Sequence, residues 1–180
     1  FQYKCFQKMM VNMIYKYNYV SPLGAITFAS SGESLMGLWF DGQKYFPDDL
    51  LSEGTETELP IFRQTANWLN TYFSGKVPDF TPLISLNTTP FCKAVCEIIL
   101  TIPYGQTMTY GEIANVIADK RGIKRMSAQA VGNAVGHNPI SIIIPCHRVV
   151  GANGSLVGYA GGLDKKIRLL KLENPIYKAI

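Results

Sequence analysis

The sequence predicts an α/β unit, built from an antiparallel sheet and one helix, followed by a mainly α-helical unit. Three early segments rich in aromatic and β-branched residues, separated by short turns, predict the sheet. Helical periodicity dominates the later part of the chain. The chain has 180 residues, of which 47% are hydrophobic and 17% charged. This composition excludes general disorder and allows one domain or two small ones.

The first unit is expected to hold three strands and one helix. The strands are expected at residues 13–20, 24–30 and 34–40. Their short connections favour an antiparallel meander. The acidic segment 48–58 is expected to be a loop. Pro60 then begins a helix that Gly75 ends.

Residues 76–88 contain two prolines and differ in composition from both flanks, which predicts a linker. We therefore expect one domain over 1–86 and a second over 87–180.

Four helices are expected in the second domain. They begin at Thr89-Pro90, after the capping box of Thr109 and Glu112, after the N-cap Ser127, and at Asp164, and the last ends near Glu173. The second and third are short and joined by a charged turn. This pattern fits a helix-turn-helix, and equally a generic helical hairpin.

The two halves of the chain differ in charge. Residues 1–86 carry six Lys and Arg against eight Asp and Glu, a net charge of −2. Residues 87–180 carry eleven against five, a net charge of +6. A polyanion partner for the second half and a solvated basic face both explain this asymmetry.

The four cysteines, Cys5, Cys92, Cys96 and Cys146, lack the spacing of a disulfide framework. We expect a reduced, cytoplasmic protein. Cys92 and Cys96 lie one helical turn apart, but structural zinc needs four N or S ligands, so no metal or other cofactor is expected. No apolar run reaches the ~20 residues that span a membrane, and residues 1–19 lack the apolar core of a signal peptide.

The segment 142–150 is the most informative in the chain. Three isoleucines predict a short buried strand that Pro145 ends. Cys146 follows at the turn, with His147 beside it. A neighbouring base promotes the thiolate that a nucleophile requires. Taken alone, Cys146 also fits an inert core cysteine.

Longer motifs around Cys146 favour a nucleophilic cysteine over an inert core cysteine. The run N-P-I-S-I-I-I-P-C-H-R-V-V-G, followed by G-Y-A-G-G-L-D-K-K and L-L-K-L-E, resembles the O6-alkylguanine-DNA alkyltransferase family. The similarity extends upstream through I-P-Y-G-Q-T-M-T-Y-G-E-I-A and covers roughly residues 87–174. The first 86 residues match only in general layout.

The resemblance implies an RNase H-like N-terminal domain and a winged-helix C-terminal domain. Its helix-turn-helix would enter the minor groove of double-stranded DNA, and the alkylated guanine would flip into a pocket. The protein would act as a monomer and without a cofactor. It would transfer the alkyl group of O6-alkylguanine, and of O4-alkylthymine, to its own cysteine in one irreversible turnover.

The resemblance also implies roles for individual residues. Cys146 would accept the alkyl group, and His147, polarised by Glu173, would take the thiol proton through a water. Tyr110 would donate to the flipped base. The pocket would include Asn138, Val149, Tyr159, Ala160 and Gly161. DNA contacts would come from Ser127, Ala128, Gln129, Gly132, Lys124 and Arg125.

Two positions depart from the family pattern. Gln129 stands where the recognition helix often carries an arginine that fills the gap left by the flipped base, so DNA affinity would rely more on neighbouring charges, including Lys120 and Arg121. Ala160 stands where some members have serine, which predicts a pocket open to bulkier alkyl groups.

Two other classes of function share part of this pattern. An alkylguanine-lesion-binding protein would recognise the base without accepting the group, but such relatives lack the cysteine. A thiol hydrolase would use the same three residues, but no oxyanion motif supports it.

Overall fold

The computed structural model describes residues 13–178, which divide into two compact units. Residues 13–42 and 46–86 form the first unit. Residues 87–178 form the second, together with the short segment Gln43–Tyr45. None of the helices in this described part of the chain combines the length and hydropathy that a bilayer crossing requires.

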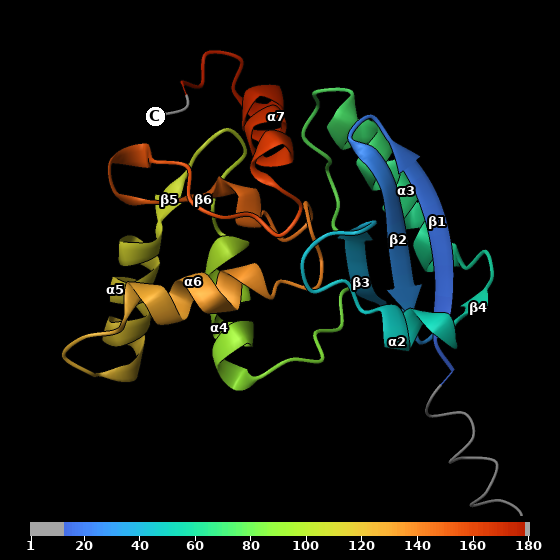
Figure 1. Cartoon of the computed structure of the whole chain (residues 1–180), viewed down its shortest axis with the longest axis horizontal. Helices are drawn as coiled ribbons and strands as arrows, with labels where there is room; N and C mark the ends of the chain where they lie inside the picture. Colours follow the sequence, from blue (N-terminus) through green and yellow to red (C-terminus); the bar gives the residue numbers. More distant parts are fainter. Residues whose placement is uncertain (1–12, 179–180) are drawn as a thin grey trace, which may run out of the picture. The chain divides into compact units, whose positions relative to one another are not determined.

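The first unit contains the expected antiparallel meander (Figure 1). Its strands are β1 (Tyr15–Ser21), β2 (Gly24–Ser30) and β3 (Leu35–Phe40). β1 pairs antiparallel with β2, and β2 pairs antiparallel with β3. The three predicted strands are confirmed to within two residues.

The prediction of a loop over residues 48–58 is wrong. The segment forms a short helix, α2 (Asp48–Ser52), and a short strand, β4 (Thr55–Glu56), which pairs in parallel with β1 and gives the sheet the order β3-β2-β1-β4. Asp48 and Asp49 lie in the first turn of α2, where the helix dipole favours negative charge. Leu51 of the same helix is buried.

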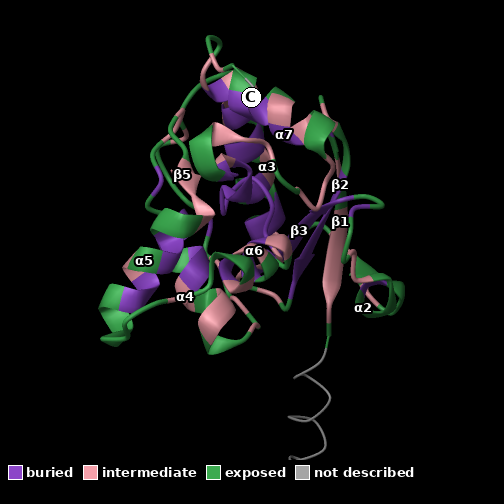
Figure 2. Cartoon of the chain, turned by 60° about the vertical axis from the view of Figure 1, so that its left-hand side comes forward, coloured by how far each residue is buried: buried purple, intermediate pink, exposed green. Residues whose placement is uncertain are grey.

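Successive side chains of β2 point to opposite faces of the sheet, and both faces are covered. Phe28 faces the helix α3 (Pro60–Phe73), and its ring centroid lies 6.1 Å from that of Phe62. The next residue, Ala29, points to the opposite face and packs with Trp39 and Leu51. Figure 2 shows the burial of β3, whose residues are almost all shielded from solvent.

The second unit is mainly helical, as predicted. Its helices are α4 (Pro90–Ile99), α5 (Tyr110–Arg121), α6 (Ala128–Gly136) and α7 (Leu163–Glu173). The Thr109 hydroxyl and Glu112 carboxylate form the complete capping box of α5, and Gly122 ends that helix in the left-handed conformation. Both predicted fold classes are therefore confirmed.

A two-stranded parallel sheet lies beside these helices. β5 (Met108–Thr109) precedes α5, and β6 (Val149–Val150) pairs with it. Two short 3₁₀ helices flank β6, namely η1 (Cys146–Arg148) and η2 (Ala152–Gly154). Because β6 follows η1 directly, the small sheet fixes the position at which the Cys146 segment ends.

Two local predictions are wrong. Residues 142–144 form a turn and not a strand, because their backbone groups bond locally: the Ile144 N–H donates to the Ile140 carbonyl, and Ile142 has a φ of 69°. The isoleucines are nevertheless buried. Asp164 lies inside the first turn of α7, and Gly162 is the N-cap residue.

Candidate active site

Cys146 lies at the start of η1 and is buried, with 5% of its surface exposed. Pro145 precedes it, and the Cys146 N–H donates to the Ile144 carbonyl at 2.7 Å. The tight turn before η1 therefore holds the thiol at a defined position, although no strand leads into it.

Asn138 holds this turn and the thiol together. Its side-chain nitrogen donates to the carbonyl oxygens of Ile140 and Ile144, at 3.1 and 2.9 Å, and to the sulfur of Cys146 at 3.1 Å. Its side-chain oxygen accepts the Ile140 N–H. One buried amide thus satisfies the backbone of the turn and offers a hydrogen bond to a thiolate.

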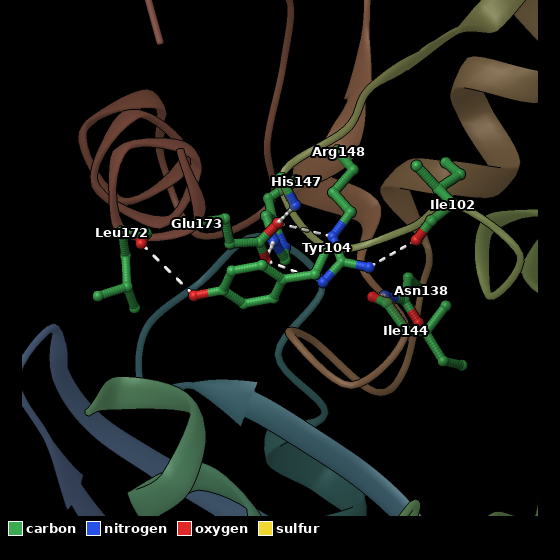
Figure 3. A network of polar contacts seen from close by, with 9 residues as sticks. Ile102, Tyr104, Asn138, Ile144, His147, Arg148, Leu172 and Glu173 are labelled. Carbon is green, nitrogen blue, oxygen red and sulfur yellow. Dashed lines mark hydrogen bonds and ion pairs between the residues drawn. The ribbon is translucent and has the colours of Figure 1, made fainter. Parts of the chain in front are cut away.

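His147, the residue after Cys146, forms a buried pair with Glu173 (Figure 3). His147 Nε2 lies 2.7 Å from Glu173 Oε1. Arg148 donates to both carboxylate oxygens, from Nε at 2.8 Å and from Nη2 at 3.0 Å, and its Nη1 donates to the Ile102 carbonyl. The Gly105 N–H is a further donor to Glu173. Arg148 therefore orients Glu173, which orients His147.

Burial and neighbouring charges set the protonation states. Burial raises the pKa of Glu173, but the hydrogen bonds and charges of His147 and Arg148 outweigh it and hold this pKa well below 4.5. Burial lowers the pKa of His147 below its ordinary 6.5, against the influence of Glu173. The pair is therefore a carboxylate and a neutral imidazole at neutral pH. Because Nε2 donates to Glu173, Nδ1 is the basic nitrogen of the ring.

Cys146 rests as a thiol. Burial raises its pKa, while the Asn138 hydrogen bond and then the charge of Lys166 act in the opposite direction. The thiol therefore needs a base to become a nucleophile, and the groups that stabilise the resulting thiolate are already in place.

Lys166 is a fully buried lysine on α7 that the sequence analysis missed. Its ammonium donates to three backbone carbonyls, those of Val149 at 2.6 Å and of Val157 and Gly158 at 3.1 Å. Burial lowers its pKa to about 8. Lys166 thus joins β6 to the loop beyond it and places a positive charge near Cys146.

A pocket of about 240 Å³ opens onto Cys146, and the second unit supplies all of its lining. It is lined by Lys44, Tyr45, Tyr110, Gly132, Asn133, Val135, Gly136, Cys146, Gly158, Tyr159 and Ala160. Tyr110 donates to the Val157 carbonyl at 3.1 Å. Burial, with a contribution from Cys146, raises the Tyr110 pKa to about 12, which keeps its hydroxyl a donor.

Three of the expected pocket residues, Asn138, Val149 and Gly161, are not part of this lining. The Val149 carbonyl accepts the Lys166 ammonium, and Gly161 lies one position beyond the lining residue Ala160. Asn138 reaches the pocket through its hydrogen bond to the Cys146 sulfur, and His147 and Glu173 are not among the lining residues.

A second, more open hollow of about 590 Å³ adjoins the first. It is lined by Thr109, Tyr110, Gly111, Ala128, Gln129, Gly132, Asn133, Ala152, Val157 and Gly158. Four residues, Tyr110, Gly132, Asn133 and Gly158, line both cavities. The N-terminal face of α6 therefore leads to the pocket that contains Cys146.

The remaining expected DNA-binding residues surround α6. Ser127 is its N-cap and accepts the Ala130 N–H at 3.3 Å. Lys124 and Arg125 are exposed in the turn between α5 and α6, and line neither cavity. They add positive charge to the segment that leads into Ala128, a lining residue of the open hollow.

Comparison with family models assigns both units. Residues 13–86 match the ribonuclease-like domain of 6-O-methylguanine DNA methyltransferase, and residues 90–175 match its DNA-binding domain. The chain belongs to the 6-O-methylguanine DNA methyltransferase family.

Individual relatives agree. The chain is 44% identical over 154 residues to a methylated-DNA–protein-cysteine methyltransferase of Mycobacterium bovis, covering 85% of this chain and 88% of that protein. It is 38% identical over 169 residues to the Haemophilus influenzae protein of the same name, covering 93% and 90%. The crystal structure of Mycobacterium tuberculosis OGT in complex with DNA matches with a TM-score of 0.77 and 40% identity, over 89% of this chain and 93% of that one.

Membership of the methyltransferase family confirms the resemblance that the motifs around Cys146 indicated. Two features of this member add to what those motifs indicated. Lys166, the last residue of the motif G-Y-A-G-G-L-D-K-K, is buried, and its ammonium joins β6 at Val149 to the start of the pocket loop (residues 158–160) at Val157 and Gly158. The segment Gln43–Tyr45 precedes the matched DNA-binding domain in sequence, yet contributes Lys44 and Tyr45 to the pocket.

Proposed function

We propose that this protein repairs alkylated DNA by direct reversal, as a methylated-DNA–protein-cysteine methyltransferase that uses Cys146 once. The observation that carries the proposal is the buried Cys146 thiol in the lining of a pocket, with the Asn138 amide on its sulfur and the His147–Glu173 pair beginning at the next residue. The names of the relatives at 38–44% identity support the same activity.

The reaction is a displacement at the alkyl carbon. His147 Nδ1 takes the Cys146 proton through a water molecule, and Glu173 stabilises the imidazolium. The sulfur forms a bond to the alkyl carbon while the bond from that carbon to O6 breaks, and the electron pair moves onto the guanine. The thiol proton ends on the guanine, and Tyr110 donates a hydrogen bond to the leaving base as charge develops.

The substrate is double-stranded DNA carrying O6-alkylguanine. A stacked base cannot present its O6 substituent in line with a buried sulfur, so the base must flip out of the helix. The open hollow along α6 would receive the DNA, with Ser127, Ala128, Gln129 and Gly132 at the groove and Lys124 and Arg125 near phosphates. O4-alkylthymine would react in the same way, since its alkyl carbon is also bonded to an exocyclic oxygen.

The product accounts for a single turnover. A thioether has no good leaving group, so the alkyl group stays on Cys146. We also propose that the protein acts as a monomer, with domains over 1–86 and 87–180. A cytoplasmic, DNA-associated location is favoured because Cys146, Cys92 and Cys96 are free thiols.

Mass spectrometry tests the proposal. The full chain is mixed with a duplex oligonucleotide containing O6-methylguanine, and the Cys146 peptide is measured. We expect a gain of about 14 Da, one methyl in place of a proton on the nucleophile. One equivalent per protein is expected, and none in Cys146→Ala. Turnover of many equivalents contradicts the proposal. Lesion binding without modification would instead indicate the non-catalytic lesion-binding alternative.

A further inference from the structure

We propose that the segment Gln43–Tyr45, here called the strap, forms the pocket wall that the O6 substituent meets and limits the size of the group transferred. This inference rests on the proposed function. The strap follows β3 in the chain and precedes α2, but packs with the second unit.

Each residue of the strap is attached to a different part of the pocket. Ser141, in the turn before Cys146, donates to the side-chain oxygen of Gln43 at 3.3 Å. The Lys44 N–H donates to the Ala160 carbonyl at 3.0 Å. The strap is therefore fixed both to the segment that carries the nucleophile and to the pocket loop.

Tyr45 makes the third attachment. Its ring stacks on that of His137, at the end of α6, with centroids 3.9 Å apart and planes inclined by 25°. The Lys44 ammonium lies 4.8 Å from the Tyr45 ring centroid. Tyr45 adopts a φ of 63°, a left-handed conformation that is uncommon for a residue with a bulky side chain. Packing of the ring compensates for this backbone conformation.

Comparison of the two cavities indicates which end of the pocket the strap lines. The open hollow and the pocket share Tyr110, Gly132, Asn133 and Gly158. A base that arrives from the DNA side passes this shared edge. The strap lines only the pocket, as Cys146 does. The group on O6 must lie between the base and the Cys146 sulfur, and so beyond the shared edge, in the part of the pocket whose lining includes Lys44 and Tyr45.

The chemistry makes this wall a determinant of specificity. In-line displacement requires the sulfur, the alkyl carbon and O6 to be collinear, so any larger substituent on that carbon projects sideways. A methyl group carries no such substituent, but the ring of a benzyl group must fit beside the strap or displace it. The strap thus counteracts the additional room that Ala160 leaves on the pocket loop.

The test compares single-turnover rates of Cys146 alkylation by duplexes containing O6-methylguanine or O6-benzylguanine. In Tyr45→Ala we expect the benzyl-to-methyl rate ratio to rise about tenfold, the discrimination that one apolar contact provides. Tyr45→Phe retains the ring and is expected to keep the wild-type ratio. Tyr15→Ala, on β1, is the control for loss of a tyrosine elsewhere.

Tyr45→Gly keeps the test decisive if Tyr45→Ala folds poorly, because glycine accepts a φ of 63° without strain. A ratio within about twofold of wild type in a folded variant, with both rates lowered equally, would overturn the inference and leave the strap a structural support. Failure of the wild-type protein to alkylate Cys146 with either duplex would instead contradict the proposed function.

Discussion

The side-chain nitrogen of Asn138 lies 3.1 Å from the sulfur of Cys146, and the same nitrogen donates to the carbonyls of Ile140 and Ile144. Asn138 is itself buried. The Asn138 side chain therefore both holds the turn together and offers the hydrogen bond that stabilises the thiolate. This explains how a turn without ladder partners holds a nucleophile in place.

Asn138→Asp separates shape from hydrogen bonding. The carboxylate has the size of the amide but cannot donate, and its charge opposes a thiolate. We expect the alkylation rate to fall about 100-fold, comparable to loss of one donor in an oxyanion site. The free energy of unfolding should fall by about 2 kcal/mol because the turn carbonyls lose their donor. Asn67→Asp, exposed on α3, is the control. An unchanged alkylation rate would remove Asn138 from the mechanism.

Lys166→Met tests the buried ammonium. Methionine fills similar space but leaves the carbonyls of Val149, Val157 and Gly158 without their common donor. We expect the unfolding free energy to fall by about 1–3 kcal/mol. Loss of the positive charge should raise the pKa of Cys146 further, which is measured by the pH dependence of iodoacetamide labelling. Lys171→Met, exposed on the same helix, should change neither quantity.

The sequence carries a signal for the burial of Lys166. Lys166, Leu169, Leu170 and Glu173 follow the spacing i, i+3, i+4 and i+7 of a buried helix face, and all four are buried. A lysine in such a position is rarely left without partners, so the pattern alone predicts a buried ammonium. By contrast, the capping box at Thr109 depends only on residues close together in the sequence, and it was predicted correctly.

Other features depend on contacts between distant segments. The strap carries no motif, and its place in the pocket follows only from bonds such as that between Lys44 and Ala160. The turn at 142–144 resembles a strand in composition, because burial selects the same residues in both. Its conformation depends on Asn138, whose side chain replaces a ladder partner.

Gly132→Ala is expected to raise stability and lower activity. Gly132 lies within α6, has no positive φ, and a Cβ there would meet only the Tyr110 ring at 3.7 Å, an ordinary contact. Alanine should raise the unfolding free energy by about 1 kcal/mol through helix propensity. The methyl group enters the edge shared by both cavities, so we expect alkylation by duplex substrate to slow about tenfold. If the variant is more stable but alkylates at the wild-type rate, the added methyl group does not hinder the base at this edge, and the prediction is contradicted.

The pH dependence should report the buried pair. The neutral form of His147 is the base, and its pKa is below 6.5, so the alkylation rate should be constant near neutral pH and fall only below pH 6.5. Stability should follow the same direction. The native pKa values of His147 and Glu173 are both lowered, so both residues contribute fully to the free energy of unfolding above pH 6.5. The contribution of His147 is lost as the pH falls below 6.5, and that of Glu173 as it falls below 4.5. If the alkylation rate already begins to fall before the pH has been lowered to 6.5, this assignment of the base is contradicted.

Glu173→Gln should slow alkyl transfer while leaving DNA binding nearly intact, because Glu173 lines neither cavity. A neutral amide cannot stabilise the imidazolium, so we expect a rate about 100-fold lower and a pH inflection moved to lower pH. Arg148 loses its carboxylate, which should cost about 3 kcal/mol of unfolding free energy. Glu97→Gln, exposed on α4, is the matched control. A loss of stability with an unchanged rate would make Glu173 a structural partner of Arg148 alone, and the thiolate would then form without the His147–Glu173 pair.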